Sequence, residues 1–93
     1  MSSDPDFLMM IEEIHRFVKS SDRVVRQREG YPVYKRYIGV CPVEAYTGDS
    51  GYTHGIHCPD LIHAYSYNGE SHVEEDQKES LISLYNLMKE GLT

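Results

Sequence analysis

The sequence lacks long apolar stretches. No apolar run reaches the roughly 20 residues that a membrane-spanning helix requires, and the N-terminus does not show the basic-then-apolar pattern of a secretory signal. We therefore expect a cytoplasmic protein with no membrane partner. Neither a linker nor an internal repeat interrupts the 93 residues, which predicts a single domain spanning residues 1–93.

Motifs that carry catalysis or bind a cofactor are also missing. The glycine-flanked stretch Gly48-Asp49-Ser50-Gly51 lacks the lysine and the following helix of a phosphate-binding loop. No segment resembles a nucleophile elbow or an oxyanion-hole loop. The acidic triplet at residues 74–76 suits a helix N-terminus, where the helix dipole favours acidic side chains. We therefore expect a protein that is not an enzyme and has no cofactor.

Cysteines and histidines are the candidate metal ligands, and they are few: Cys41, His54, His57, Cys58 and His63. Zinc needs four ligands within about 2.3 Å of one point, but this spacing contains no C-x2-C pair. Strand alternation also places His57 and Cys58 on opposite faces. We expect no metal, although an irregular loop at residues 53–60 would favour a small zinc-stabilised domain. Cys41 and Cys58 are expected to be buried free thiols, with a disulfide between them as the alternative.

A β-hairpin is predicted at the centre of the chain, around the turn residues 48–51. A two-residue loop there makes Ala45 face His54 and Cys41 face Cys58. Alternation then assigns one face of the hairpin to the core: Cys41, Val43, Ala45, Thr47, Tyr52, His54, Ile56 and Cys58. A longer loop is the alternative.

Two amphipathic helices flank this hairpin. Residues 3–6 combine a capping serine with a proline in the first turn, and apolar residues follow at helical spacing as far as Val18. A capping box at residues 71–74 predicts the start of the second helix. That helix is expected to run to about Glu90, with Gly91 just beyond its end.

The rest of the chain reads as further strands at residues 31–40 and 61–67, while residues 23–28 suit either a strand or an extension of the first helix. Pro32 indicates an edge strand or the start of a strand, because it has no N–H for the ladder. The predicted class is α+β, with the order helix, antiparallel three- or four-stranded β-meander, helix. Both helices are expected on one face of the sheet.

Charge is unevenly distributed along the chain. The net charge is −6, yet residues 23–36 carry five bases against one acid. The overall acidity argues against general nucleic-acid affinity. Residues 23–37 interleave these bases with tyrosines, a combination that suits a phosphorylated nucleotide. The alternative is that these cations pair with the protein's own acids and protect an edge strand.

Tyrosine is abundant, with eight residues and no tryptophan. One small core does not hold eight rings, so some are expected on an outer sheet surface, where tyrosine favours interfaces. The candidate binding residues are Arg23, Arg26, Arg28, Tyr31, Tyr34, Lys35, Arg36, Tyr37, Tyr46, Tyr65 and Tyr67.

These observations predict a small acidic non-enzymatic binding protein that occupies the surface of a macromolecular partner. The partner is expected to be a protein, and the chain would act as an inhibitor, an immunity-type protein or an adaptor. The alternative is a small-ligand binder that holds a nucleotide through residues 23–37. A homodimer is also possible, through an edge strand beginning at Tyr31-Pro32 or through the aromatic face of the sheet.

Overall fold

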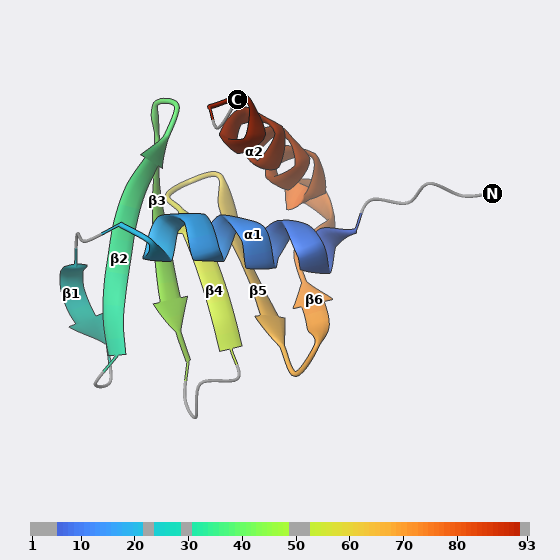
Figure 1. Cartoon of the computed structure of the whole chain (residues 1–93). Helices are drawn as coiled ribbons and strands as arrows, with labels where there is room; N and C mark the ends of the chain where they lie inside the picture. Colours follow the sequence, from blue (N-terminus) through green and yellow to red (C-terminus); the bar gives the residue numbers. More distant parts are fainter. Residues whose placement is uncertain (1–5, 22–23, 29–30, 49–52, 92–93) are drawn as a thin grey trace.

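The fold is a single antiparallel sheet with two helices packed on one of its faces (Figure 1). The computed structural model describes residues 6–21, 24–28, 31–48 and 53–91. Along the chain the elements are α1 (Phe7–Lys19), β1 (Val24–Arg28), β2 (Tyr31–Ile38), β3 (Cys41–Thr47), β4 (Thr53–Cys58), β5 (Ile62–Tyr67), β6 (Glu70–His72), the 3-10 helix η2 (Glu75–Gln77) and α2 (Lys78–Gly91). The six strands lie in the order β1 to β6. The predicted α+β meander is confirmed, with more strands than the three or four expected.

Helix α1 begins and ends close to where the sequence predicts. The carboxylate of Asp6 accepts a hydrogen bond from the amide of Met9 at 3.0 Å and caps the N-terminus. Residues 3–5 of the predicted start lie outside the described residues. The helix ends at Lys19, and its apolar stripe contributes the following buried side chains: Met10, Ile11, Ile14 and Val18. Among the helices described, none has the length and apolar character needed to cross a membrane.

The start of the second helix differs from the prediction. Residues 70–72 form strand β6, which pairs with Tyr67 to Tyr65 of β5, so Ser71 does not cap a helix. Asn68 and Gly69 adopt positive φ values of 51° and 83° and reverse the chain directly after β5. This tight turn lays the next residues beside β5, where the ladder satisfies the backbone groups that a cap would have satisfied. Helix α2 therefore starts only at Lys78, and it includes Gly91.

The sequence left open whether residues 23–28 form a strand or extend the first helix. Residues 24–28 form a strand and not an extension of α1. Because β1 pairs with β2, and β3 pairs with its other side, β2 is not an edge strand. Pro32 is instead the second residue of β2, near the strand start. The prediction of a self-associating edge at Tyr31-Pro32 is wrong for this reason.

The central hairpin has a different register from the one predicted. Ala45 pairs with Ile56, not with His54. The amide of Gly48 donates to the carbonyl of Thr53 at 2.8 Å, so the connecting loop is longer than two residues. The two-residue loop is therefore wrong and the longer alternative is right, because loop length fixes the pairing register.

The register shift is by two residues, so each side chain keeps its predicted face. The core lies between this face and the helices and contains the following buried side chains: Val43, Ala45, Ile56 and Cys58 of the hairpin, Ile62 and Ala64 of β5, and Leu81, Leu84 and Met88 of α2. Cys41 and Cys58 no longer oppose one another, and both are free thiols. Burial, and then the neighbouring Cys41, raise the pKa of Cys58.

Candidate functional site

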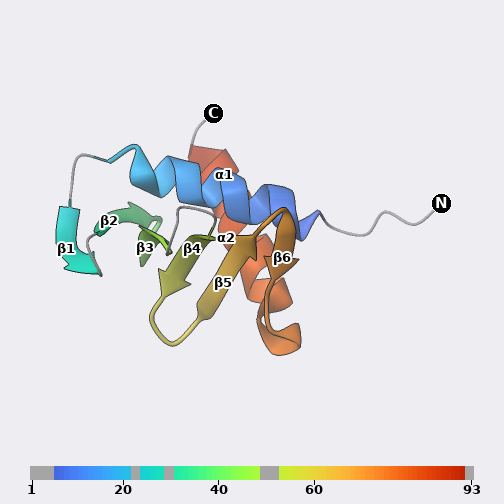
Figure 2. The same ribbon diagram turned by 90° about the horizontal axis from the view of Figure 1, so that it is seen from below.

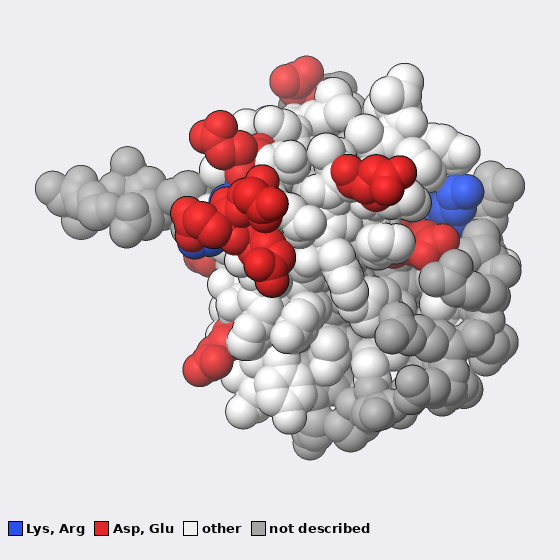
Figure 3. All heavy atoms as spheres, turned by 180° about the vertical axis from the view of Figure 1, so that it is seen from behind, with Lys and Arg blue, Asp and Glu red and all other residues white. Residues whose placement is uncertain are grey.

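The sheet has one face that the described helices leave uncovered, which we call the open face. Figure 2 shows α1 lying along one side of the strands, and Figure 3 shows the molecule from the opposite side. Strand pairing aligns open-face residues into two rows across the sheet. One row contains Val33, Tyr46, Gly55, Tyr65 and His72, and the other contains Lys35, Glu44, His57 and His63.

Tyr46 is the best-fixed side chain of the open face. Its ring lies over Gly55, so closely that a Cβ at position 55 would stand 2.1 Å from Tyr46 Cζ. Its hydroxyl lies 2.6 Å from Nε2 of His63, within hydrogen-bonding distance. A glycine inside a strand commonly marks such a close approach. The ring is thus held between a glycine beneath it and a hydrogen bond at its tip.

Aromatic contacts continue from Tyr46 along the open face. The ring centroids of His57 and His63 are 5.4 Å apart in an edge-on arrangement, and those of His63 and Tyr65 are 6.5 Å apart. Tyr65 stacks on His72 with a centroid distance of 4.7 Å and an interplanar angle of 13°. These five side chains form one contiguous surface, the open-face cluster: Tyr46, His57, His63, Tyr65 and His72.

A groove of about 310 Å³ lies beside the open-face cluster, lined by β5, by β6 and by the segment that follows β6. Six residues line it: His63, Tyr65, Ser71, His72, Val73 and Glu74. Gln77 of η2 accepts a hydrogen bond from the His63 amide at 3.1 Å, which ties η2 to the edge of β5. The groove therefore has polar walls set by two fixed elements.

Acidic side chains gather on one side of the open face. Figure 3 shows most of the red carboxylates gathered on the side of β6 and η2, with a further red patch in the upper middle of the view and a red and a blue group on the opposite side. Glu44 lies 3.8 Å from Nδ1 of His57 and pairs across the strands with Lys35. Tyr67, 50 % exposed, extends the aromatic surface at the end of β5.

The basic-aromatic segment does not form one site among its described side chains. Arg36 points to the helix side, where its guanidinium donates to the Phe17 carbonyl at 3.1 Å and to the Ser20 hydroxyl at 2.8 Å. Tyr34 packs against the core, whereas Lys35 lies 5.5 Å from the ring centroid of Tyr37, which is exposed. Strand alternation thus places neighbouring residues of the basic-aromatic segment on opposite faces of the sheet. Four predicted residues lie outside the described side chains: Arg23, Arg26, Arg28 and Tyr31.

A second polar cluster lies under α1 on the covered face. The Glu12 carboxylate accepts hydrogen bonds from Nδ1 of His54 at 2.8 Å and from the hydroxyl of Ser66. Burial alone would raise the pKa of Glu12, but these two hydrogen bonds and the adjacent histidine charges outweigh it and lower the pKa. The Ser66 hydroxyl is almost fully buried, and its hydrogen bond to Glu12 ties β5 to α1.

His15 completes this cluster. Its ring stacks on that of His54 at 4.7 Å, and its Nε2–H donates to the carbonyl of Tyr46 at 3.1 Å. Burial and the charge of His54 lower the pKa of His15 to about 4. The ring is therefore neutral at physiological pH and links α1 to β3.

The candidate metal ligands are dispersed by the sheet. Within the described ranges, no three histidine, cysteine or acidic side chains are placed to share a metal ion. Residues 53–58 form a regular strand, so the irregular loop that would favour a zinc-stabilised domain is absent from this described segment. His54 faces α1 while His57 and His63 lie on the open face.

Of the open-face cluster, Tyr46 and Tyr65 are predicted binding residues, whereas His57 and His63 are considered only as metal ligands and His72 is not selected. Their grouping depends on pairing between strands that are separate in the sequence. The interior glycine at position 55 was the available signal. A comparison with protein-family models, curated proteins and solved structures finds no match to this chain.

Proposed function

We propose that this protein is a non-enzymatic binding protein that occupies the surface of a protein partner through its open face. The observation that carries the proposal is the open-face cluster, a contiguous surface of two tyrosines and three histidines on a sheet face outside the core. Aromatic side chains with polar tips are enriched in protein interfaces, since they combine apolar area with hydrogen bonding.

The rigidity of the cluster supports this role. Tyr46 is fixed by its contact with Gly55 and its bond to His63, and Tyr65 is stacked on His72. Side chains that are already ordered lose little conformational freedom on association, which favours binding. Aromatic anchors of this kind are typical centres of interface energy.

Charge favours a protein partner with a basic rim. The net charge is −6, and Glu44, Glu70 and Glu74 lie on or beside the open face. Opposite charges at the rim of an interface speed association and select partners. The same acids disfavour a phosphate backbone. Inhibitors, immunity-type proteins and adaptors act by occupying a surface in this way. We also propose that the protein is cytoplasmic, because free thiols such as Cys41 and Cys58 persist in a reducing compartment.

The test is capture from native lysate followed by affinity measurement on the captured protein. Wild type is compared with Tyr65→Ser and with Tyr85→Phe, a matched tyrosine control on α2 on the helix side. We expect Tyr65→Ser to weaken the affinity tenfold or more, and Tyr85→Phe to leave it within twofold. Equal effects of the two variants, or no protein enriched by wild type, would overturn the proposal.

A further inference from the structure

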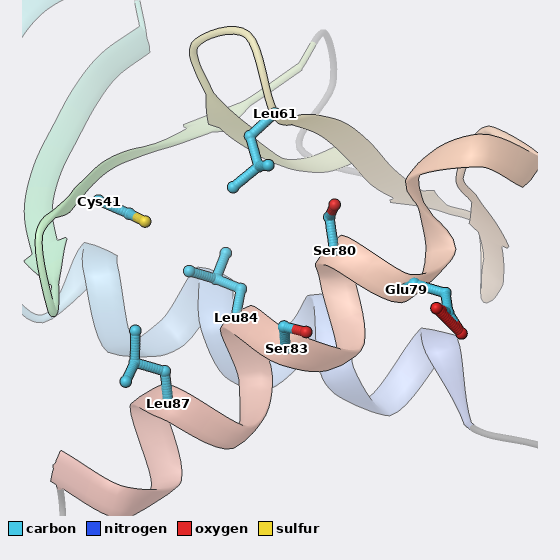
Figure 4. Close-up of a pocket in the computed structure, with 7 residues that line it drawn as sticks. All are labelled: Cys41, Leu61, Glu79, Ser80, Ser83, Leu84 and Leu87. Carbon is cyan, nitrogen blue, oxygen red and sulfur yellow. The ribbon is translucent and has the colours of Figure 1, made fainter.

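An apolar groove lies away from the open face, between α2 and the sheet ends that carry Cys41 and Leu61 (Figure 4). Its volume is about 230 Å³, below the roughly 300 Å³ at which pockets for drug-sized ligands begin. Its walls are the side chains of Leu61, Leu84 and Leu87 and the thiol of Cys41. The size and lining suit one or two apolar side chains.

Close packing fixes the shape of this groove. The turn at Gly39, with φ of +64°, lies so near Leu87 that a Cβ at position 39 would stand 2.7 Å from Leu87 Cδ2. Leu61 and Leu87 are each 39 % exposed, and Val40 beside the groove is 89 % exposed. Contiguous apolar surface rimmed by polar residues is the form that interaction sites take.

One acidic residue lines the groove. Glu79 is the charged residue among the side chains that line it. The two lysines of α2 are turned to the α1 side: Lys78 Nζ lies 5.4 Å from the Phe7 ring centroid, and Lys89 Nζ lies 3.5 Å from Glu13. The groove therefore has mainly apolar walls, with one carboxylate, Glu79, two serines, Ser80 and Ser83, and no lining cation among the described residues.

We propose that this groove binds a peptide segment of a partner protein in which a large apolar residue is flanked by lysine or arginine. The apolar side chain would fill the space between Leu61 and Leu87, and the flanking cations would meet Glu79. Charge complementarity favours this occupant over a second copy of the chain, because each copy carries Glu79 in the groove and a net charge of −6. The surface is distinct from the open face, so the two sites can be tested separately.

The probe is a fluorescein-labelled peptide in which a Phe-Leu pair is flanked on each side by two lysines, followed by fluorescence anisotropy. We expect saturable binding to wild type and at least tenfold weaker binding to Leu87→Gln, which keeps the charge and removes the wall. Asn86→Gln on the exposed side of α2 and Tyr67→Ser on the open face should bind as wild type does. A peptide with Ser-Ser in place of Phe-Leu should bind at least tenfold less tightly.

A second measurement locates the bound peptide. Cys41 borders the groove, whereas Cys58 is buried, so iodoacetamide reports on Cys41 in the folded protein. We expect saturating peptide to slow alkylation of Cys41 at least fivefold. Equal binding by Leu87→Gln, equal binding of the Ser-Ser peptide, or unprotected Cys41 would overturn the proposal, as would a concentration-dependent dimer that Leu87→Gln abolishes. Failure here leaves the result on the open face unaffected.

Discussion

The ring of Tyr46 covers Gly55 on the neighbouring strand, and the two residues are direct cross-strand partners. A Cβ at position 55 would lie 2.1 Å from Tyr46 Cζ, well inside van der Waals contact. Glycine weakens a strand interior by its backbone entropy, yet here it leaves the space that the ring occupies. The position of the tyrosine hydroxyl next to His63 follows from this packing.

Replacement of Gly55 by alanine is therefore expected to destabilise the protein by about 1–3 kcal/mol, the usual range for overpacking. The ring of Tyr46 has to leave its position, which also breaks the contact with His63. Urea unfolding of Gly55→Ala, Tyr46→Ala and the double variant measures the coupling. In the double variant the clash is gone, so its loss of stability should be smaller than the sum of the single losses by at least about 0.5 kcal/mol. Additive losses would show that the two residues do not interact as described.

The carboxylate of Glu12 supports a buried hydroxyl. Ser66 is 2 % exposed and donates to Glu12, which also accepts from His54. Glu12→Ala removes the acceptor of both groups, and an unsatisfied buried polar group costs about 1–3 kcal/mol. We expect that loss in chemical denaturation, and a smaller loss when Ser66→Ala is added to Glu12→Ala. Glu70→Ala, at an exposed position of β6, is the control and should change stability by less than about 0.5 kcal/mol. A double variant less stable than Glu12→Ala would contradict this account.

Arg36 stabilises the end of α1. Its guanidinium donates to the Phe17 carbonyl and the Ser20 hydroxyl and stacks on the Phe17 ring at 3.9 Å. Cations near a helix C-terminus are favourable because the last carbonyls lack helical partners. We expect Arg36→Ala to lower the free energy of unfolding by about 1–2 kcal/mol, with Arg36→Lys intermediate because lysine cannot reproduce the planar fork.

The matched control for Arg36 is Lys35→Ala on the opposite face of the same strand. This variant should change stability by less than about 0.5 kcal/mol, since Lys35 lies on the open face, where its Nζ lies over the ring of exposed Tyr37. Equal effects of the two substitutions would show that the arginine has no structural role. A large loss of stability in Lys35→Ala alone would show that Lys35, and not Arg36, lies on the helix side of β2.

The features predicted well are those determined by local sequence. The apolar stripe of α1 and the strand alternation of β3 to β5 follow from periodicities of 3.6 and 2, and both place the core correctly. The two helices share one face of the sheet because each has a single apolar side. The class of fold was therefore accessible from the sequence.

The features missed depend on contacts between distant segments. Ser71 fits a helix cap by sequence, but pairing with Ser66 draws it into the sheet. The hairpin register depends on the loop after Thr47, where turn-forming residues allow more than one loop length. The open-face cluster requires that register, because His63 meets Tyr46 across two strand pairings. The basic segment is continuous in the sequence, but strand alternation places Arg36 on the helix side of β2 and Lys35 on the open face.

The buried His15 makes stability depend on pH. Its side chain is 5 % exposed, and burial and the adjacent His54 lower its pKa to about 4 from the ordinary value of 6.5. Above pH 6.5 the ring is neutral in the folded and unfolded chains, so its contribution to stability is complete. As the pH falls from 6.5 to about 4, His15 binds a proton in the unfolded chain but not in the folded chain, so the free energy of unfolding decreases. Below about 4 both forms are protonated, and the loss from this group ends.

At pH 5 the lowered pKa of His15 reduces the free energy of unfolding by about 2 kcal/mol, since each pKa unit corresponds to about 1.4 kcal/mol. His15→Gln keeps a donor for the Tyr46 carbonyl but cannot titrate, so its stability should fall less between pH 7 and pH 5. Other charged groups around the ring are Glu12, Arg16, Lys19 and His54. The lowered pKa of Glu12 matters only below its ordinary value of 4.5, outside this window. Urea unfolding of both proteins at pH 7, 6 and 5 measures the difference, and parallel losses would show that folding does not lower the pKa of His15.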